Sequence, residues 1–167
     1  MRVIKAEFPR LDEHSLPGLI GAVGVYVIWD GQARARPTYL GEGTILKRLA
    51  EHSTRFALPF DGYIAILGDL SSRTAKRESE IVEALLLSVA YETDRLPVHN
   101  RAPGKTTGLQ RIFRSHGVLR VSVSGYDPLG IPWQGGRMPS PKVLRLEDVG
   151  LGLLEIRHDW RLRRRQL

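Results

Sequence analysis

The stretch from Gly24 to His52 constrains the fold more than any other part of this 167-residue chain. It begins with a β-branched and aromatic run that ends at Trp29, which predicts a strand, and Asp30-Gly31 is typical of the turn that follows a strand. Thr38–Leu40 predicts a second strand that closes a hairpin. Gly41-Glu42-Gly43 then gives the backbone the freedom to leave this strand sharply.

A helix is predicted directly after these glycines. From Ile45 onward, apolar residues recur at the spacing of one helix face, and polar residues fill the other face. Arg48 and His52 are four residues apart, so they share that polar face. The pattern therefore predicts a hairpin followed at once by a helix, with two tyrosines, an arginine and a histidine close together in the chain.

The ordered set of motifs resembles the GIY-YIG nuclease family. Gly24-Val25-Tyr26 is followed by Tyr39-Leu40-Gly41 and then by the arginine and the histidine. The resemblance continues through an acidic helix expected at residues 77–90 to Leu96–Asn100, which is similar to the family's closing Pro-x-x-Asn. The family includes intron homing endonucleases, some restriction enzymes and the incision subunit of bacterial nucleotide excision repair.

The expected fold is α/β, a small central mixed β-sheet of about three strands flanked by helices, with extra C-terminal elements. The chain divides into a lead-in at residues 1–20, a GIY-YIG-like nuclease domain at 21–102 and a C-terminal extension at 103–167 that packs on the domain or is accessory to it. Outside the hairpin, alternating or β-branched runs predict strands at residues 3–8, 62–67 and 118–124. Residues 143–156 predict either a hairpin or a strand followed by a helix.

The resemblance implies a role for each motif residue. Arg48 would stabilise the phosphate, because its planar guanidinium matches phosphate oxygens. Tyr26 and Tyr39 would orient or activate the attacking water, and His52 would assist proton transfer or hold a phosphate. Asn100 would tie the site together by hydrogen bonding. Taken singly, each of these residues also has a structural interpretation, and it is their order that favours the functional one.

The resemblance also implies one Mg²⁺ or Mn²⁺, held largely by a glutamate and water. We assign this role to Glu83, because aliphatic residues follow it at the family's usual offsets. Glu78 and Glu80 are alternatives. A gapless comparison with the excision-repair branch places Ser88 where the metal glutamate belongs, which would leave an inactive nucleic-acid-binding module of the same fold.

The charge of the chain favours an anionic partner. Lys and Arg total 25 against 18 Asp and Glu, and the formal net charge is +7. Candidate phosphate contacts are Arg34, Arg36, Lys47, Arg163, Arg164 and Arg165. Because the chain has no cysteine, disulfides and thiolate zinc sites are excluded.

No apolar run is long enough to span a bilayer, and the N-terminus lacks the apolar core of a signal peptide, so we expect a cytoplasmic protein with no membrane partner. The function predicted from the sequence is a divalent-metal-dependent endonuclease that hydrolyses phosphodiester bonds in DNA. The sequence leaves open DNA versus RNA, the specificity, the pathway and the oligomeric state.

Overall fold

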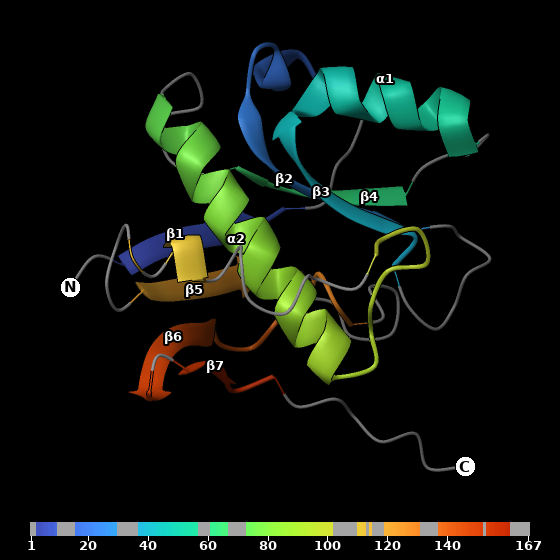
Figure 1. The fold of residues 1–167 in the computed structure, drawn as a ribbon. Helices are drawn as coiled ribbons and strands as arrows, with labels where there is room; N and C mark the ends of the chain where they lie inside the picture. Colours follow the sequence, from blue (N-terminus) through green and yellow to red (C-terminus); the bar gives the residue numbers. More distant parts are fainter. Residues whose placement is uncertain are drawn as a thin grey trace, which may run out of the picture.

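The computed structural model describes residues 3–9, 16–29, 37–56, 61–66, 73–101, 110–112, 114, 119–130, 137–151 and 153–160. The fold is α/β, with one mixed sheet whose strand order is β3-β2-β4-β1-β5-β6-β7 (Figure 1). The strands are β1 (Val3–Phe8), β2 (Val23–Trp29), β3 (Tyr39–Thr44), β4 (Asp61–Ile66), β5 (Leu119–Gly125), β6 (Lys142–Gly150) and β7 (Leu153–His158). β1 and β5 are parallel, and every other neighbouring pair is antiparallel.

The three strands expected around the motifs are present as β2, β3 and β4, but they form only one end of the sheet. The expected number of about three strands is therefore wrong, because the described residues form a sheet of seven. The difference arises at β1, which pairs with β4 on one side and with β5 on the other. This pairing joins residues more than one hundred positions apart in the chain, and no local sequence pattern predicts it.

The second motif strand is also longer than predicted. β3 continues through Gly41 and Gly43 to Thr44 instead of leaving the sheet at Leu40. The glycines are retained in the strand because β3 keeps its ladder with β2 over this whole length, from Ile28↔Tyr39 to Val23↔Thr44. Gly43 has a φ of +133°, a backbone conformation that glycine adopts readily and other residues rarely do.

Two helices cover opposite faces of the sheet at its β2–β3 end. α1 (Ile45–Phe56) packs with a short 3₁₀ helix, η1 (Leu16–Leu19), over the face that carries Tyr26 and Ile28. α2 (Arg73–Glu92) packs over the other face, which carries Val25 and Val27. The two side-chain sets alternate along β2, as successive residues of a strand do.

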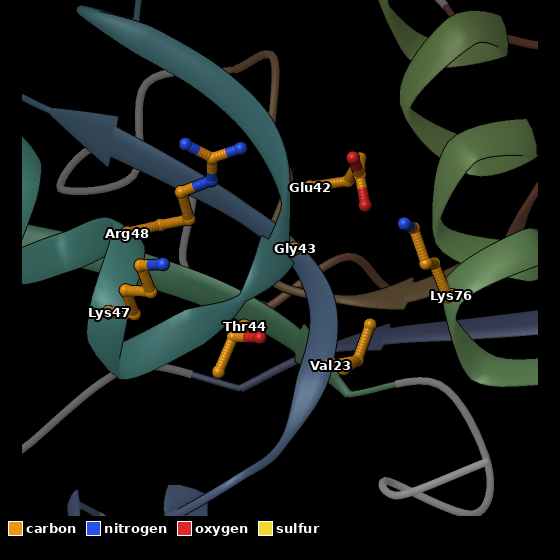
Figure 2. A pocket seen from close by; sticks show the side chains of 7 residues that line it. All are labelled: Val23, Glu42, Gly43, Thr44, Lys47, Arg48 and Lys76. Carbon is orange, nitrogen blue, oxygen red and sulfur yellow. The ribbon is translucent and has the colours of Figure 1, made fainter. Parts of the chain in front are cut away.

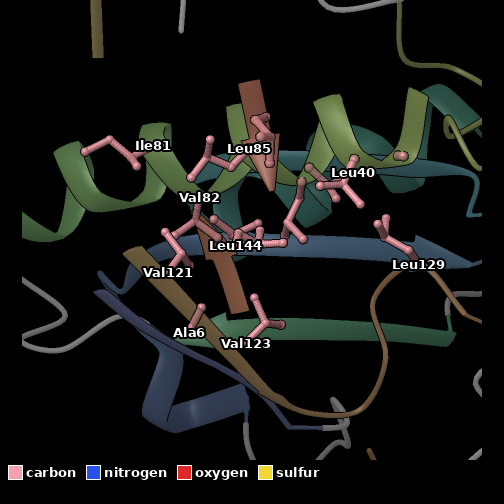
Figure 3. Packing of buried hydrophobic residues seen from close by; sticks show 14 of the residues in the cluster. Ala6, Leu40, Ile81, Val82, Leu85, Val121, Val123, Leu129 and Leu144 are labelled. Carbon is pink, nitrogen blue, oxygen red and sulfur yellow. The ribbon is translucent and has the colours of Figure 1, made fainter. Parts of the chain in front are cut away.

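The core under α2 is the larger one and runs across both halves of the sheet (Figure 3). Val82 and Leu85 of α2 pack with Ala6 of β1, Val121 of β5 and Leu144 of β6, all of them buried. β5 alternates buried and partly exposed side chains, so its buried residues all face α2. One apolar layer therefore holds the strands that carry the motifs and the C-terminal strands together.

Candidate active site

The two motif tyrosines lie on the α1 face because of the β2–β3 register. Tyr26 is opposite Gly41, and Tyr39 precedes Gly41 by two residues, so both rings project to the same side of the sheet. The rings stack with their centroids 6.1 Å apart. His52 of α1 closes the group, and its ring centroid is 4.5 Å from that of Tyr39.

Tyr26 and His52 are joined by a hydrogen bond in the buried interior. The Tyr26 Oη and His52 Nε2 atoms are 2.8 Å apart. Burial, followed by the charges of Arg55 and Arg48, lowers the pKa of His52, so its imidazole is neutral at pH 7. Burial also raises the pKa of Tyr26, so the phenol keeps its proton. The tyrosine hydroxyl is therefore the donor and the imidazole Nε2 is the acceptor.

Glycine is the only residue type that fits at position 41, between these two rings. A Cβ atom at this position would lie 2.6 Å from Tyr26 Oη and 2.6 Å from Tyr39 Cε1, closer than van der Waals contact allows. Both contacts are to aromatic rings held by their neighbours, which cannot move aside as a flexible chain end can. The glycine of the second motif thus lets the two tyrosines approach each other across the hairpin.

Asn100 forms hydrogen bonds with the outer edge of β3, next to the tyrosines. Its Oδ1 accepts a hydrogen bond from the Leu40 amide, and its Nδ2 donates one to the Leu40 carbonyl, both at 2.8 Å. The segment before it lies along the same edge, where the amides of Val98 and His99 donate to the carbonyls of Pro37 and Thr38. The side-chain amide of Asn100 thus takes the place of a neighbouring strand.

Arg48 lies at the mouth of a small cavity beside β3. Its guanidinium is about half exposed and its Nη1 is 2.9 Å from Oε2 of Glu51. The cavity has a volume of about 220 Å³, and Figure 2 shows that side chains from β3, α1 and α2 surround it. Its lining residues are Val23, Glu42, Gly43, Thr44, Lys47, Arg48 and Lys76. We refer to it as the β3 cavity.

Three α2 side chains project toward this edge of the sheet. Lys76, Glu80 and Glu83 are spaced by four and then three residues, so they share one helix face, and Glu78 lies on a different face. Burial, followed by the neighbouring charges of Glu42 and Glu80, raises the pKa of Glu83 to about 7. The charge of Glu83 in turn helps to raise the pKa of Tyr39, after burial. The charges of Glu83 and Arg48 therefore both act on the tyrosines, although Glu83 lies on α2 and the tyrosines lie on the α1 face of the sheet.

Ser88 lies elsewhere on α2. It is buried, and its hydroxyl donates to the Ala84 carbonyl one turn earlier in the helix.

Glu42 is a site residue that the sequence analysis missed. Its Oε2 is buried and has no hydrogen-bond partner among the described residues. Burial, followed by the charge of Glu80, raises its pKa, while Lys76 opposes the rise. Its position directly after Gly41 could have marked it, had β3 been expected to continue beyond Leu40. Lys76 could have been found from its helical spacing to Glu83.

Glu42 and Glu83 are the carboxyl groups that a divalent cation could use at this place. Burial, followed by neighbouring carboxylates, raises the pKa of both, and a hard cation takes carboxylate oxygens as ligands. Among the described residues, no group of three or more acidic or histidine side chains is arranged to hold a metal ion. A cation here would therefore take most of its ligands from water and from the substrate.

Of the expected phosphate contacts, Lys47 lines the β3 cavity. Arg34, Arg36, Arg163, Arg164 and Arg165 lie outside the described residues. In the described part of the chain, no helix has the length and apolar character needed to cross a membrane.

The mixed sheet with a helix on each face is compatible with the α/β class expected from the sequence. No family model, no curated protein and no solved structure matches the chain.

Proposed function

We propose that this protein is a divalent-metal-dependent endonuclease of the GIY-YIG type that acts on DNA. The observation that carries the proposal is the cluster at the edge of β3, where Tyr26, Tyr39 and His52 pack together and the charges of Arg48 and Glu83 act on both tyrosines. These residues come from β2, β3, α1 and α2. The formal net charge of +7 supports an anionic polymer as the substrate.

Phosphodiester hydrolysis forms a bond from a water oxygen to phosphorus and breaks the bond to the leaving oxygen, while negative charge grows on the phosphate. Arg48 meets that charge, because its guanidinium is exposed and remains protonated at every working pH. The cavity beside it also presents Lys47 and Lys76, which would hold the neighbouring backbone phosphates.

The proton of the attacking water can leave through the tyrosine–histidine pair. Tyr26 donates its hydroxyl proton to the neutral His52. When the Tyr26 oxygen accepts a proton from the water, it can therefore pass its own proton to His52 Nε2. Tyr26 is 1% exposed, whereas Tyr39 is only partly buried. We therefore assign the contact with water to Tyr39 and the proton acceptance to the buried pair behind it.

Glu83 and Glu42 are the residues that would hold the cation. When bound, it would supply a positive charge against the nonbridging and leaving oxygens. Its presence would also keep Glu83 ionised at pH 7, because a neighbouring cation lowers a carboxyl pKa.

The test is cleavage of supercoiled plasmid, single-stranded DNA and RNA in Mg²⁺, in Mn²⁺ and in EDTA. We expect metal-dependent cleavage that falls by about 100-fold or more in Arg48→Ala, as when one group that stabilises transition-state charge is removed. Glu83→Gln should abolish the metal-dependent cleavage. The matched controls are Arg145→Ala, an exposed arginine of β6, and Glu78→Gln, on another face of α2, and both should cleave at the native rate.

A second candidate is a nucleic-acid-binding module without catalysis. It is favoured by the gapless comparison, which places Ser88 at the family's metal position, and the Ser88 hydroxyl is taken up by a hydrogen bond within α2. Salt-sensitive DNA binding with no cleavage in any metal would select this candidate, and loss of cleavage in Glu83→Gln but not in Glu78→Gln would reject it.

A further inference from the structure

The two edge strands of the sheet differ in whether another described segment covers their backbone. At one edge, the 97–100 segment and the Asn100 amide cover the backbone of β3. At the other edge, β7 pairs with β6 on its inner side, and no other described segment hydrogen-bonds to its outer side. An uncovered edge strand presents a row of backbone donors and acceptors that can pair with another chain.

The charges on the solvent face of β7 are poorly matched within the chain. In the β6–β7 register, Arg157 is opposite Arg145 and Glu155 is opposite Glu147, so like charges face each other at two successive exposed positions. Arg157 relieves this by a diagonal ion pair with Glu147, at 3.2 Å. Glu155 has no ion pair among the described residues.

We propose that β7 pairs antiparallel with β7 of a second copy of this chain, about a twofold axis at Ile156. In this register Glu155 of each copy is directly opposite Arg157 of the other, which makes two cross-strand pairs of opposite charge. Residues on one face of a strand must meet residues of the same face when the axis is perpendicular to the sheet. A shift of the axis to Glu155 would oppose the two Glu155 carboxylates, so the register at Ile156 is the favoured one.

The hairpin between β6 and β7 exposes apolar side chains next to this edge. Val149 is 49%, Leu151 102% and Leu153 63% exposed, and they are close together in the chain at the hairpin tip. Because the pairing is antiparallel, the tip of each copy would lie beside the C-terminal end of the other β7. The same patch is used on both copies, as a twofold interface requires.

The proposed dimer places the two β3 edges at the outer ends of one continuous sheet, as far apart as the sheet allows. The inference does not rest on the proposed function, because no site residue takes part in the pairing. The two candidate active sites would face separate stretches of nucleic acid.

The test uses sedimentation of the full chain and of two charge variants, Glu155→Arg and Arg157→Glu. Each variant places like charges opposite each other in the proposed register, so its dissociation constant should rise by roughly 10- to 100-fold. An equimolar mixture of the two variants should form a heterodimer, because each pair then again joins opposite charges. The double variant Glu155→Arg/Arg157→Glu should dimerise as the native chain does. Both residues are exposed, and circular dichroism checks that each variant is folded.

A native chain that sediments as a monomer over the whole accessible concentration range would overturn the proposal. So would single variants that dimerise as well as the native chain, or a mixture of them that stays monomeric. Recovery in both the mixture and the double variant would establish the register at Ile156.

Discussion

Glu83 is the residue at which burial and charge are in conflict. A carboxyl is normally exposed or paired with a cation, yet Glu83 is partly buried and two further carboxyls, Glu42 and Glu80, act on it. Arg48 opposes the resulting rise in pKa but does not cancel it. Such an arrangement destabilises the folded chain at neutral pH, and the cation of the proposed function would relieve it.

We predict a pH-dependent effect of Glu83→Gln on stability in EDTA. The pKa of Glu83 is raised from 4.5 in the unfolded chain to about 7 in the folded one, so the folded state holds the extra proton between these values. Native stability therefore falls as the pH rises from 4.5 through 7. Relative to Glu83→Gln, the native chain should lose about 3 kcal/mol between acidic and alkaline pH, as measured by urea unfolding.

The control for this measurement is Glu78→Gln, which should follow the native pH dependence. Adding Mg²⁺ at alkaline pH should stabilise the native chain and not Glu83→Gln, because only the native chain offers the carboxylate. Equal stabilisation of the two proteins would remove Glu83 from the cation site without any reference to cleavage.

At the scale of elements, the site depends on the contacts that hold β3 at its outer edge, on the side away from β2. β3 is an edge strand rich in glycine, and such a strand is weakly specified by its own side chains. The Asn100 amide supplies one donor and one acceptor to Leu40, which lies between Tyr39 and Gly41. The position of the Tyr39 ring is thus set from outside the sheet.

We predict that Asn100→Ala loosens β3 more than it destabilises the whole protein. Removal of the amide leaves the Leu40 amide and carbonyl without partners, at a cost of about 1 to 3 kcal/mol. The readout is hydrogen exchange of the Leu40 amide, which should speed up strongly while the α2 amides change little. Asn100→Asp is the graded comparison, because its carboxylate still accepts from the amide but cannot donate to the carbonyl. Unchanged exchange at Leu40 in both variants would contradict the role assigned to the amide.

The helices and strands that have a clear local sequence pattern were predicted well. The strands at 3–8 and 62–67 and the helix that begins at Ile45 lie within a residue or so of their observed bounds, and residues 143–156 form a hairpin, one of the two alternatives. The helix expected at 77–90 extends to Arg73–Glu92, because helix ends carry weaker signals than helix centres. The continuation of β3 was missed because its glycines are typical of a turn, and only pairing with β2 keeps them in a strand.

The candidate site was predictable where it rests on motifs and not where it rests on packing. Tyr26, Tyr39 and His52 could be grouped in advance because a hairpin and the helix after it are close in the chain. Glu42 entered the site only once the register of β3 and the position of α2 were known. Its buried oxygen is a property of three elements together, and no single stretch of sequence carries it.

At the scale of the whole molecule, β1 is the strand that makes one sheet out of two parts. Only β1 lies between the strands that carry the motifs and the C-terminal strands β5 to β7. Phe8 is fully buried in the core that α2 covers, together with residues of β2 on one side and of β5 and β6 on the other. A chain built in this way should unfold as one unit, because neither part can open without exposing the core of the other.

We therefore predict that Phe8→Ala lowers the stability of both parts together. Truncating a fully buried phenylalanine costs about 3 to 5 kcal/mol, and the loss should appear as a shift of one urea transition, with the same midpoint by circular dichroism and by tryptophan fluorescence. Val3→Ala, on the same strand but 42% exposed, is the control and should shift the midpoint only slightly. Two transitions, of which only one moved in Phe8→Ala, would show instead that residues 21–102 and 103–167 fold separately, so this measurement also tests the division of the chain made from the sequence.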